Sequence, residues 1–183
     1  AGAVVTPPLP SAAIETDDAA VTWRRVIDYV HGKDALIGAR LVMPSQAALE
    51  RALFAGFDLI VLDPDGDEAA VERLPALVAA TRARYPSLWL AAVVDDWRTA
   101  RAAVVGRGAQ LVRAGVDMLW VTSVGDGNAR LAAAPLADRL RNELRVATCV
   151  EATDASASDI DAAIAAGRAD LVVVPRVLHR GAR

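Results

Sequence analysis

Apolar runs of strand length alternate with helical patterns along almost the whole chain, and this alternation constrains the fold more than any other feature. The runs recur roughly every 25 to 30 residues and are apolar nearly throughout, as expected of strands covered on both faces of a parallel sheet. They occupy residues 1–5, 35–42, 57–63, 88–95, 116–123, 146–152 and 170–176. Because strands and helices that alternate in this way form right-handed βαβ units, we predict an α/β fold with a parallel sheet.

Helical periodicity fills the segments between these runs. The first helical segment has an apolar stripe made of Trp23, Val26, Ile27 and Val30. The spacing within 68–84 is also helical, but Pro75 would remove an interior hydrogen bond, so we expect a kink there or a helix that begins near Pro75. Further along, Ser156 followed by Asp159 is typical of a helix start. Gly167 is typical of a helix end.

Two architectures are compatible with repeated βαβ units: an open doubly wound sheet and a closed (β/α)8 barrel. The segment AGAVVTPPLP offers prolines where a dinucleotide-binding domain has its glycine-rich turn, which argues against that domain. The repeat is also uniform, which favours the barrel. A barrel needs eight strands and seven are found, so either a strand is missing on the N-terminal side or the barrel is incomplete.

Composition limits the possible partners and location. The chain has 183 residues, 54% of them hydrophobic, which is enough for one sizeable core, and we expect a single domain over 1–183. The net charge of −3, without clustered Lys or Arg, argues against nucleic-acid binding, and the longest apolar runs are too short to span a membrane. The single Cys149 excludes an internal disulfide and fits a small core residue in a reducing compartment. Since the N-terminus also lacks a signal-peptide pattern, we expect a cytoplasmic protein.

Several segments resemble a known family in order and spacing. They read TWRRVIDYVHGKDALIGARL, LERALFAGFDLIVLD, LVRAGVDMLWVTS, APLADRLRNELRVATCV and AAIAAGRADLVVVPR. They are similar to the old yellow enzyme family of NAD(P)H:flavin oxidoreductases. The similarity is strongest to the reductase-like domain of salicylyl-CoA 5-hydroxylases and anthraniloyl-CoA monooxygenases, in which DDW at 95–97 also has a counterpart. The resemblance implies a TIM (β/α)8-type barrel that lacks its first strand within this chain, in a larger polypeptide or complex.

The resemblance also implies where flavin and substrate would be held, and this sequence departs from the family at most of those positions. Arg40 stands where the family has a flavin-contacting Gln, and the substrate-anchoring His pair falls near Asp63 and Gly66. The Gly-Gly turn that binds the FMN phosphate aligns with VEAT, which puts Glu151 near the phosphate. The final Gly-Arg element survives in part, as Arg176 preceded by a proline. The remaining candidate FMN contacts are Arg176, Arg40 and Ser123.

The charges and backbone at the phosphate position favour a chain that binds no FMN over one that does. A phosphate site needs backbone N–H donors and positive charge, whereas Pro175 removes an N–H and Glu151 adds a negative charge. A like-charge contact at about 4 Å costs on the order of 4 kcal/mol at an effective dielectric near 20. Arg176 alone offsets little of this. We therefore expect no catalytic residues of the family type.

Three functions follow from the sequence as hypotheses. The first is a degenerate flavin oxidoreductase barrel that serves as a structural or interaction domain of a flavin-dependent aryl-CoA monooxygenase system, with another domain or subunit as its partner. The second is an active FMN-dependent NAD(P)H oxidoreductase with a rewired site. The third is a divalent-metal-dependent barrel enzyme with an acidic mouth. The acidic residues concerned, which also fit turns and helix N-caps, are Asp63, Asp65, Asp67, Asp95, Asp96, Asp126, Glu151 and Asp154.

The remaining aromatic and histidine side chains fit structural roles. Trp23, Trp89 and Trp120 are expected in the core, because they lie in a helix stripe or in strands. Trp97 follows a strand beside two Asp and is a candidate for a partner surface. His31 ends a helical segment, where a partly charged imidazole interacts favourably with the helix dipole.

Overall fold

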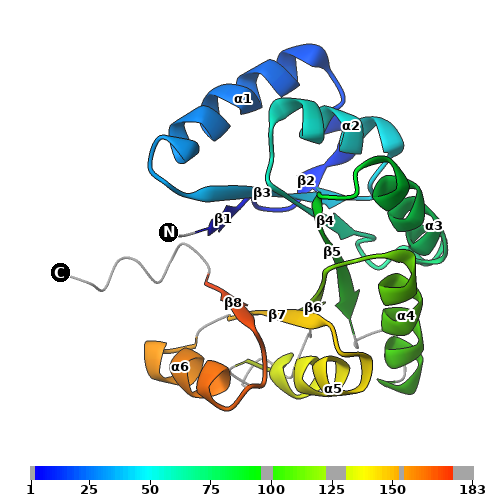
Figure 1. Ribbon diagram of the computed structural model, residues 1–183, viewed down its shortest axis with the longest axis vertical. Helices are drawn as coiled ribbons and strands as arrows, with labels where there is room; N and C mark the ends of the chain where they lie inside the picture. The colour runs from blue at the N-terminus through cyan, green and yellow to red at the C-terminus, as the bar shows by residue number, and fades with distance from the viewer. Residues whose placement is uncertain (1–2, 96–100, 123–130, 153–154, 175–183) are drawn as a thin grey trace. The chain divides into compact units, whose positions relative to one another are not determined.

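The computed structural model describes residues 3–95, 101–122, 131–152 and 155–174, and Figure 1 shows strands and helices that alternate along the chain. The chain divides into two compact units. Unit 1 comprises Ala1–Ala92 and Ala114–Val116, and unit 2 comprises Val93–Arg113 and Asp117–Arg183. In both units the paired strands are parallel and helices connect them, so the predicted α/β class is confirmed.

Unit 1 is a parallel sheet in the order β1-β3-β4-β5, with the short β2 paired to β3 beyond the end of β1. Its strands are β1 (Ala3–Val5), β2 (Leu9–Pro10), β3 (Leu36–Val42), β4 (Leu59–Asp63) and β5 (Trp89–Asp95), of which unit 1 includes residues up to Ala92. A 3-10 turn, η1 (Ser11–Ala13), follows β2. The helices are α1 (Asp17–His31), α2 (Gln46–Ala55) and α3 (Glu68–Arg84), and α1 packs beside α2 (Figure 1).

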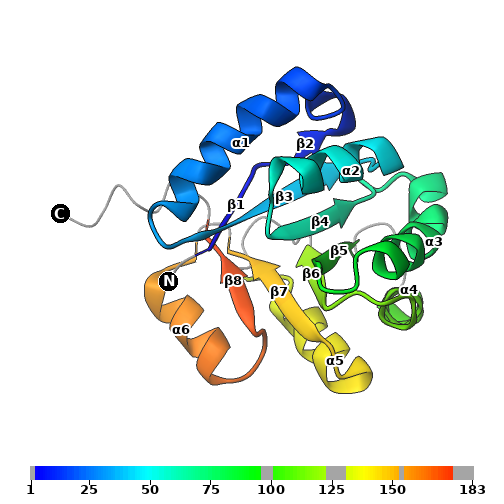
Figure 2. The same cartoon turned by 45° about the horizontal axis from the view of Figure 1, so that its top comes forward.

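Unit 2 contains three parallel strands in the order β6-β7-β8. These strands are β6 (Met118–Thr122), β7 (Ala147–Glu151) and β8 (Leu171–Val173). Helix α4 (Arg101–Ala114) precedes β6, α5 (Ala134–Leu144) connects β6 to β7, and α6 (Ala157–Ala165) connects β7 to β8. Figure 2 shows α5 and α6 beside the strands that they connect.

The strands form the core of both units. Every residue of β4 is buried, and β6 and β7 bury their central residues on both faces, as continuous apolar runs predict. All seven predicted strands are confirmed, and β2 is a further two-residue strand that the apolar pattern does not indicate. Cys149 is 1% exposed in β7, which confirms it as a core residue.

The buried face of α1 differs by one position from the predicted stripe. Ala20 and Ile27 are buried, and Trp23 is half-buried with its ring 5.5 Å from that of Phe57. Val26 is 42% exposed, so its predicted place in the stripe is wrong. Ala20 is buried on one side of Trp23, whereas Val26 is exposed on the other side. The buried face of α1 is therefore rotated about the helix axis, by about one residue position, relative to the predicted stripe.

Helix boundaries follow local hydrogen bonds. Asp67 caps α3 by accepting the Ala70 N–H at 2.7 Å, so this helix begins at Glu68 and includes Pro75; a start near Pro75 is wrong. The capping box at Ser156 is confirmed, with its side chain accepting from the Asp159 backbone N–H. Gly167 follows α6 at φ +66°, the left-handed conformation predicted for a glycine after a helix end.

The tryptophans divide between core and surface. Trp120 is 2% exposed and confirms the core assignment. Trp89 begins β5 and is 42% exposed, so its assignment to the core is wrong: the first residue of a strand extends beyond the covered part of the sheet. Trp97 lies outside the described residues. No helix in the described part of the chain is long and apolar enough to cross a membrane.

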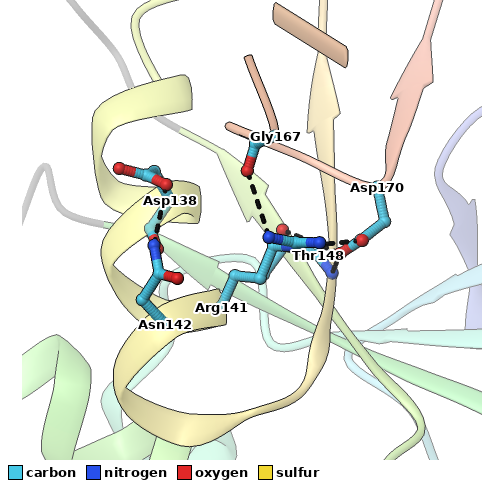
Figure 3. Close-up of polar contacts among 6 residues, drawn as sticks. All are labelled: Asp138, Arg141, Asn142, Thr148, Gly167 and Asp170. Carbon is cyan, nitrogen blue, oxygen red and sulfur yellow. Dashed lines mark hydrogen bonds and ion pairs between the residues drawn. The ribbon is translucent and has the colours of Figure 1, made fainter. Parts of the chain in front are cut away.

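Two strands begin at an aspartate that bonds to the neighbouring strand. Asp58 precedes β4, and its carboxylate accepts the Ile37 N–H at 2.8 Å and lies 2.9 Å from His31 Nε2. Asp170 precedes β8, where its carboxylate accepts the Thr148 N–H at 2.9 Å. Figure 3 shows Arg141 reaching Asp170 from α5, with its Nε 2.9 Å from Oδ1. These carboxylates tie helix to sheet at the amino ends of the strands. His31 thus ends α1 as predicted, and it also has a charged partner.

Candidate site at the carboxyl ends of the strands

In unit 1, an arginine and an aspartate form an ion pair at the carboxyl ends of two neighbouring strands. Arg40 lies near the end of β3 and Asp63 is the last residue of β4, and the parallel register sets Val42 beside Asp63. The Arg40 Nε donates to Asp63 Oδ2 at 2.8 Å. The two side chains are only 14% and 7% exposed, so this is a largely buried pair.

The backbone around the pair holds both residues in place. The second oxygen of Asp63 accepts the Asp65 N–H at 2.8 Å, and Asp65 has a positive φ of 50°. The Arg40 N–H donates to the hydroxyl of Thr6, which is 8% exposed. The Asp63 carboxylate therefore has a partner for each oxygen, as a buried charge requires.

The turn after β3 is fixed by a second set of hydrogen bonds. Met43 has a φ of 48°, and its N–H donates to the Asp63 carbonyl at 2.8 Å. The Ser11 hydroxyl donates to the Met43 carbonyl at 2.8 Å and accepts the Ser45 N–H at 3.3 Å. Ser45 in turn caps α2 by accepting the Ala48 N–H at 3.0 Å. These bonds join η1, β3, β4 and α2 into one hydrogen-bonded corner.

In unit 2, a carboxylate is fixed at a strand end by an indole. Glu151 is the last residue of β7, and its Oε1 accepts the Trp120 Nε1–H at 2.9 Å. The indole belongs to a buried side chain of β6, which restricts where the carboxylate can lie. The next residue, Ala152, donates its N–H to the Val173 carbonyl at 2.8 Å, so this N–H is already bonded within the sheet.

The chemistry open to these two groups is limited by their internal partners. In the Arg40–Asp63 pair the opposite charges compensate one another, so the pair adds no net positive charge to the strand ends of unit 1. Glu151 contributes a carboxylate where the resemblance expects a phosphate-binding turn. Anion binding is favoured by net positive charge, which neither the neutralised pair nor Glu151 supplies.

The other predicted site residues have different outcomes. Ser123 and Arg176, and the acidic residues Asp96, Asp126 and Asp154, lie outside the described residues. Asp67 is the N-cap of α3, which confirms the structural interpretation of this residue. Among the described residues, no group of three or more His, Cys, Asp or Glu side chains has the arrangement of a metal site.

The sequence places Arg40, Asp63 and Glu151 near strand ends, but it does not predict the Arg40–Asp63 ion pair or the Trp120–Glu151 hydrogen bond. The ion pair could have been expected, because Arg40 and Asp63 are opposite charges near the ends of consecutive apolar strands. The hydrogen bond could have been expected because Trp120, in the strand before Glu151, carries an indole N–H donor.

Comparison with known proteins gives a likeness of fold. The chain is similar to the crystal structure of the YdjI aldolase from Escherichia coli K12, with a TM-score of 0.62, 14% sequence identity and 93% of this chain covered. The chain spans 65% of the length of that aldolase. No family model matches the sequence, and no curated protein matches it. At this identity the likeness concerns the fold alone.

Proposed function

We propose that this chain is a degenerate barrel of the old yellow enzyme type, which binds no FMN and serves as a structural or interaction domain of a flavin-dependent aryl-CoA monooxygenase system. The motifs that build the strands and helices are retained, whereas the residues that would hold flavin and substrate are replaced. Such a combination keeps a fold and a surface without the chemistry of the site.

The Arg40–Asp63 ion pair is the observation that supports this proposal most directly. Arg40 aligns with a flavin-contacting Gln and Asp63 falls near the substrate-anchoring His pair, and here these two positions satisfy one another at 2.8 Å. A flavin that displaced Asp63 from the Arg40 Nε would leave a carboxylate 7% exposed without its cation. The same cost applies to an active FMN reductase in which the flavin takes that Nε.

In this proposal the parallel strands belong to a (β/α)8-type barrel, and another segment of a larger polypeptide or complex supplies the strand that closes it. Strand β1 occupies one end of the strand order, and its Val4 is 52% exposed. An edge strand that exposes an apolar side chain is normally covered by another element. A domain of the monooxygenase system would provide that cover.

Co-expression tests the interaction role. The chain is produced together with a flavin-dependent aryl-CoA monooxygenase from the same source, and the mixture is separated by gel filtration. The proposal predicts co-elution of the two, and separate elution of the chain from an unrelated flavin monooxygenase of similar size. Separate elution from both enzymes, together with an encoding gene that carries no further domain, contradicts the interaction role.

A further inference from the structure

The outward face of α1 exposes a line of large side chains on the opposite side of the helix from its buried residues. Val21 is 47% exposed and Tyr29 is 69% exposed, and the exposed Arg25 lies midway between them. Residues at i, i+4 and i+8 follow one another along one helix face, so these three form a continuous ridge. We call Asp18, Val21, Arg25, Tyr29 and Lys33 the α1 ridge.

Charges of opposite sign lie at the two ends of the ridge. Asp18 is in the first turn of α1 and is exposed. Lys33 lies two residues after the helix, with its Nζ 5.6 Å from the centre of the Tyr29 ring. Asp17, by contrast, forms an ion pair with Arg51 on the neighbouring helix α2. The ridge therefore runs from the acidic Asp18, through Val21, Arg25 and the Tyr29 ring, to the basic Lys33.

This order of side chains is complementary to its own reverse. If two copies of α1 pack antiparallel with Arg25 at the centre, Val21 of each copy lies opposite Tyr29 of the other. Asp18 then lies opposite Lys33 at both ends. The two Arg25 side chains meet at the two-fold axis, where Asp28 of the other copy is one turn away and offsets their repulsion. A contact of this kind is isologous, because both copies use the same patch.

We propose that this chain self-associates into a two-fold symmetric dimer through antiparallel packing of the α1 ridge. The partner on this surface is a second copy of the chain, because Asp18 of one copy pairs with Lys33 of the other at both ends of the ridge. A single helix pair buries less than the roughly 1,200 Å² of a standard stable interface, so the dimer dissociates on dilution. The ridge lies outside the candidate site, and the dimer does not depend on the proposed function.

Charge exchange tests the pairing of Asp18 with Lys33. Sedimentation equilibrium of the full chain over a wide concentration range compares the wild type with Asp18→Lys, Lys33→Glu and the double variant. We expect each single variant to weaken dimerisation about tenfold or more, since each places like charges at both ends of the ridge. The double variant restores the opposite pairs and recovers most of the affinity. Glu72→Lys in α3 changes the net charge as Asp18→Lys does, and it leaves dimerisation unchanged.

A wild-type chain that stays monomeric at every concentration overturns the proposal, as do single variants that dimerise like the wild type or a double variant that does not recover.

Disulfide crosslinking gives an independent readout. Arg25→Cys places a thiol at the proposed two-fold axis, so mild oxidation should yield a covalent dimer, whereas the exposed control Glu72→Cys should not. Equal crosslinking of the two variants shows random collision and also overturns the proposal.

Discussion

Asp63 lies at the end of β4 with both carboxylate oxygens occupied, one by Arg40 and the other by the Asp65 N–H. A buried carboxylate loses its hydration, and the nearby guanidinium compensates for that loss only while the geometry is kept. The Arg40–Asp63 ion pair therefore offsets the cost of burying these two charges where β3 and β4 end.

Removal of one partner from this pair should cost more stability than removal of both. We expect Arg40→Met to lower the free energy of unfolding by about 3–5 kcal/mol, because it leaves a buried, uncompensated carboxylate. The double variant Arg40→Met/Asp63→Leu should lose much less, since no buried charge is left unpaired. Urea denaturation of the wild type, Arg40→Met, Asp63→Leu and the double variant measures the difference. A double variant at least as unstable as Arg40→Met would contradict this expectation, and single losses that add up in the double variant would show that the pair is not coupled.

At the scale of single residues, the sequence predicted positions but not partners. Arg40 and Asp63 were recognised as strand-end residues, yet their contact depends on the register between β3 and β4. Continuous apolar strands carry little register information, because a slip by one residue still buries apolar side chains on both faces. The Trp120–Glu151 bond depends on the β6–β7 register in the same way.

At the scale of elements, the strands are held to their neighbours at their amino ends by carboxylates. Asp58 joins β4 to β3 through Ile37 and to α1 through His31, and Asp170 joins β8 to β7 through Thr148. The Asp58 N–H also donates to the Ile37 carbonyl at 2.9 Å, and the Asp170 N–H donates to the Thr148 carbonyl at 3.0 Å. The arrangement ties β4 to β3 and β8 to β7 where each ladder begins.

Substitution of Asp58 tests the stabilising effect of this arrangement. Asp58→Ala should lower the free energy of unfolding by about 1–3 kcal/mol, because the Ile37 N–H and the His31 ring both lose their acceptor. Asp58→Asn keeps an oxygen acceptor of the same shape and should cost clearly less. Chemical denaturation of the two variants beside the wild type gives the comparison. Equal losses in the two variants would argue that the side-chain oxygen does not stabilise the strand start.

The elements themselves were predictable because their patterns are strong. Seven apolar runs gave seven strands, and Ser156 with Asp159 gave a capped helix start. The helix faces were less certain, since Ala20 and Val26 both extend a plausible apolar stripe and the packing partner decides between them. Pro75 did not stop α3, because the cap at Asp67 and the buried Leu74 and Val78 support the helix on both sides of it.

At the scale of the whole molecule, the fold is that of parallel α/β proteins, and the likeness to an aldolase extends over 93% of this chain. Such a fold supports many activities, so the function depends on the residues at the strand ends. In each unit a carboxylate that ends a strand is bonded internally: Asp63 to Arg40, and Glu151 to Trp120. These internal bonds support the proposal that the scaffold of a flavin oxidoreductase is kept and its flavin site is lost.

The most direct test of this claim is the visible absorption spectrum of the purified protein, recorded before and after incubation with excess FMN and desalting. A known FMN protein treated in parallel shows that desalting leaves bound flavin in place. We expect no flavin band in either spectrum of this protein. A flavin band that remains after desalting would contradict this expectation, and would mean that the strand ends still bind FMN despite the Arg40–Asp63 pair.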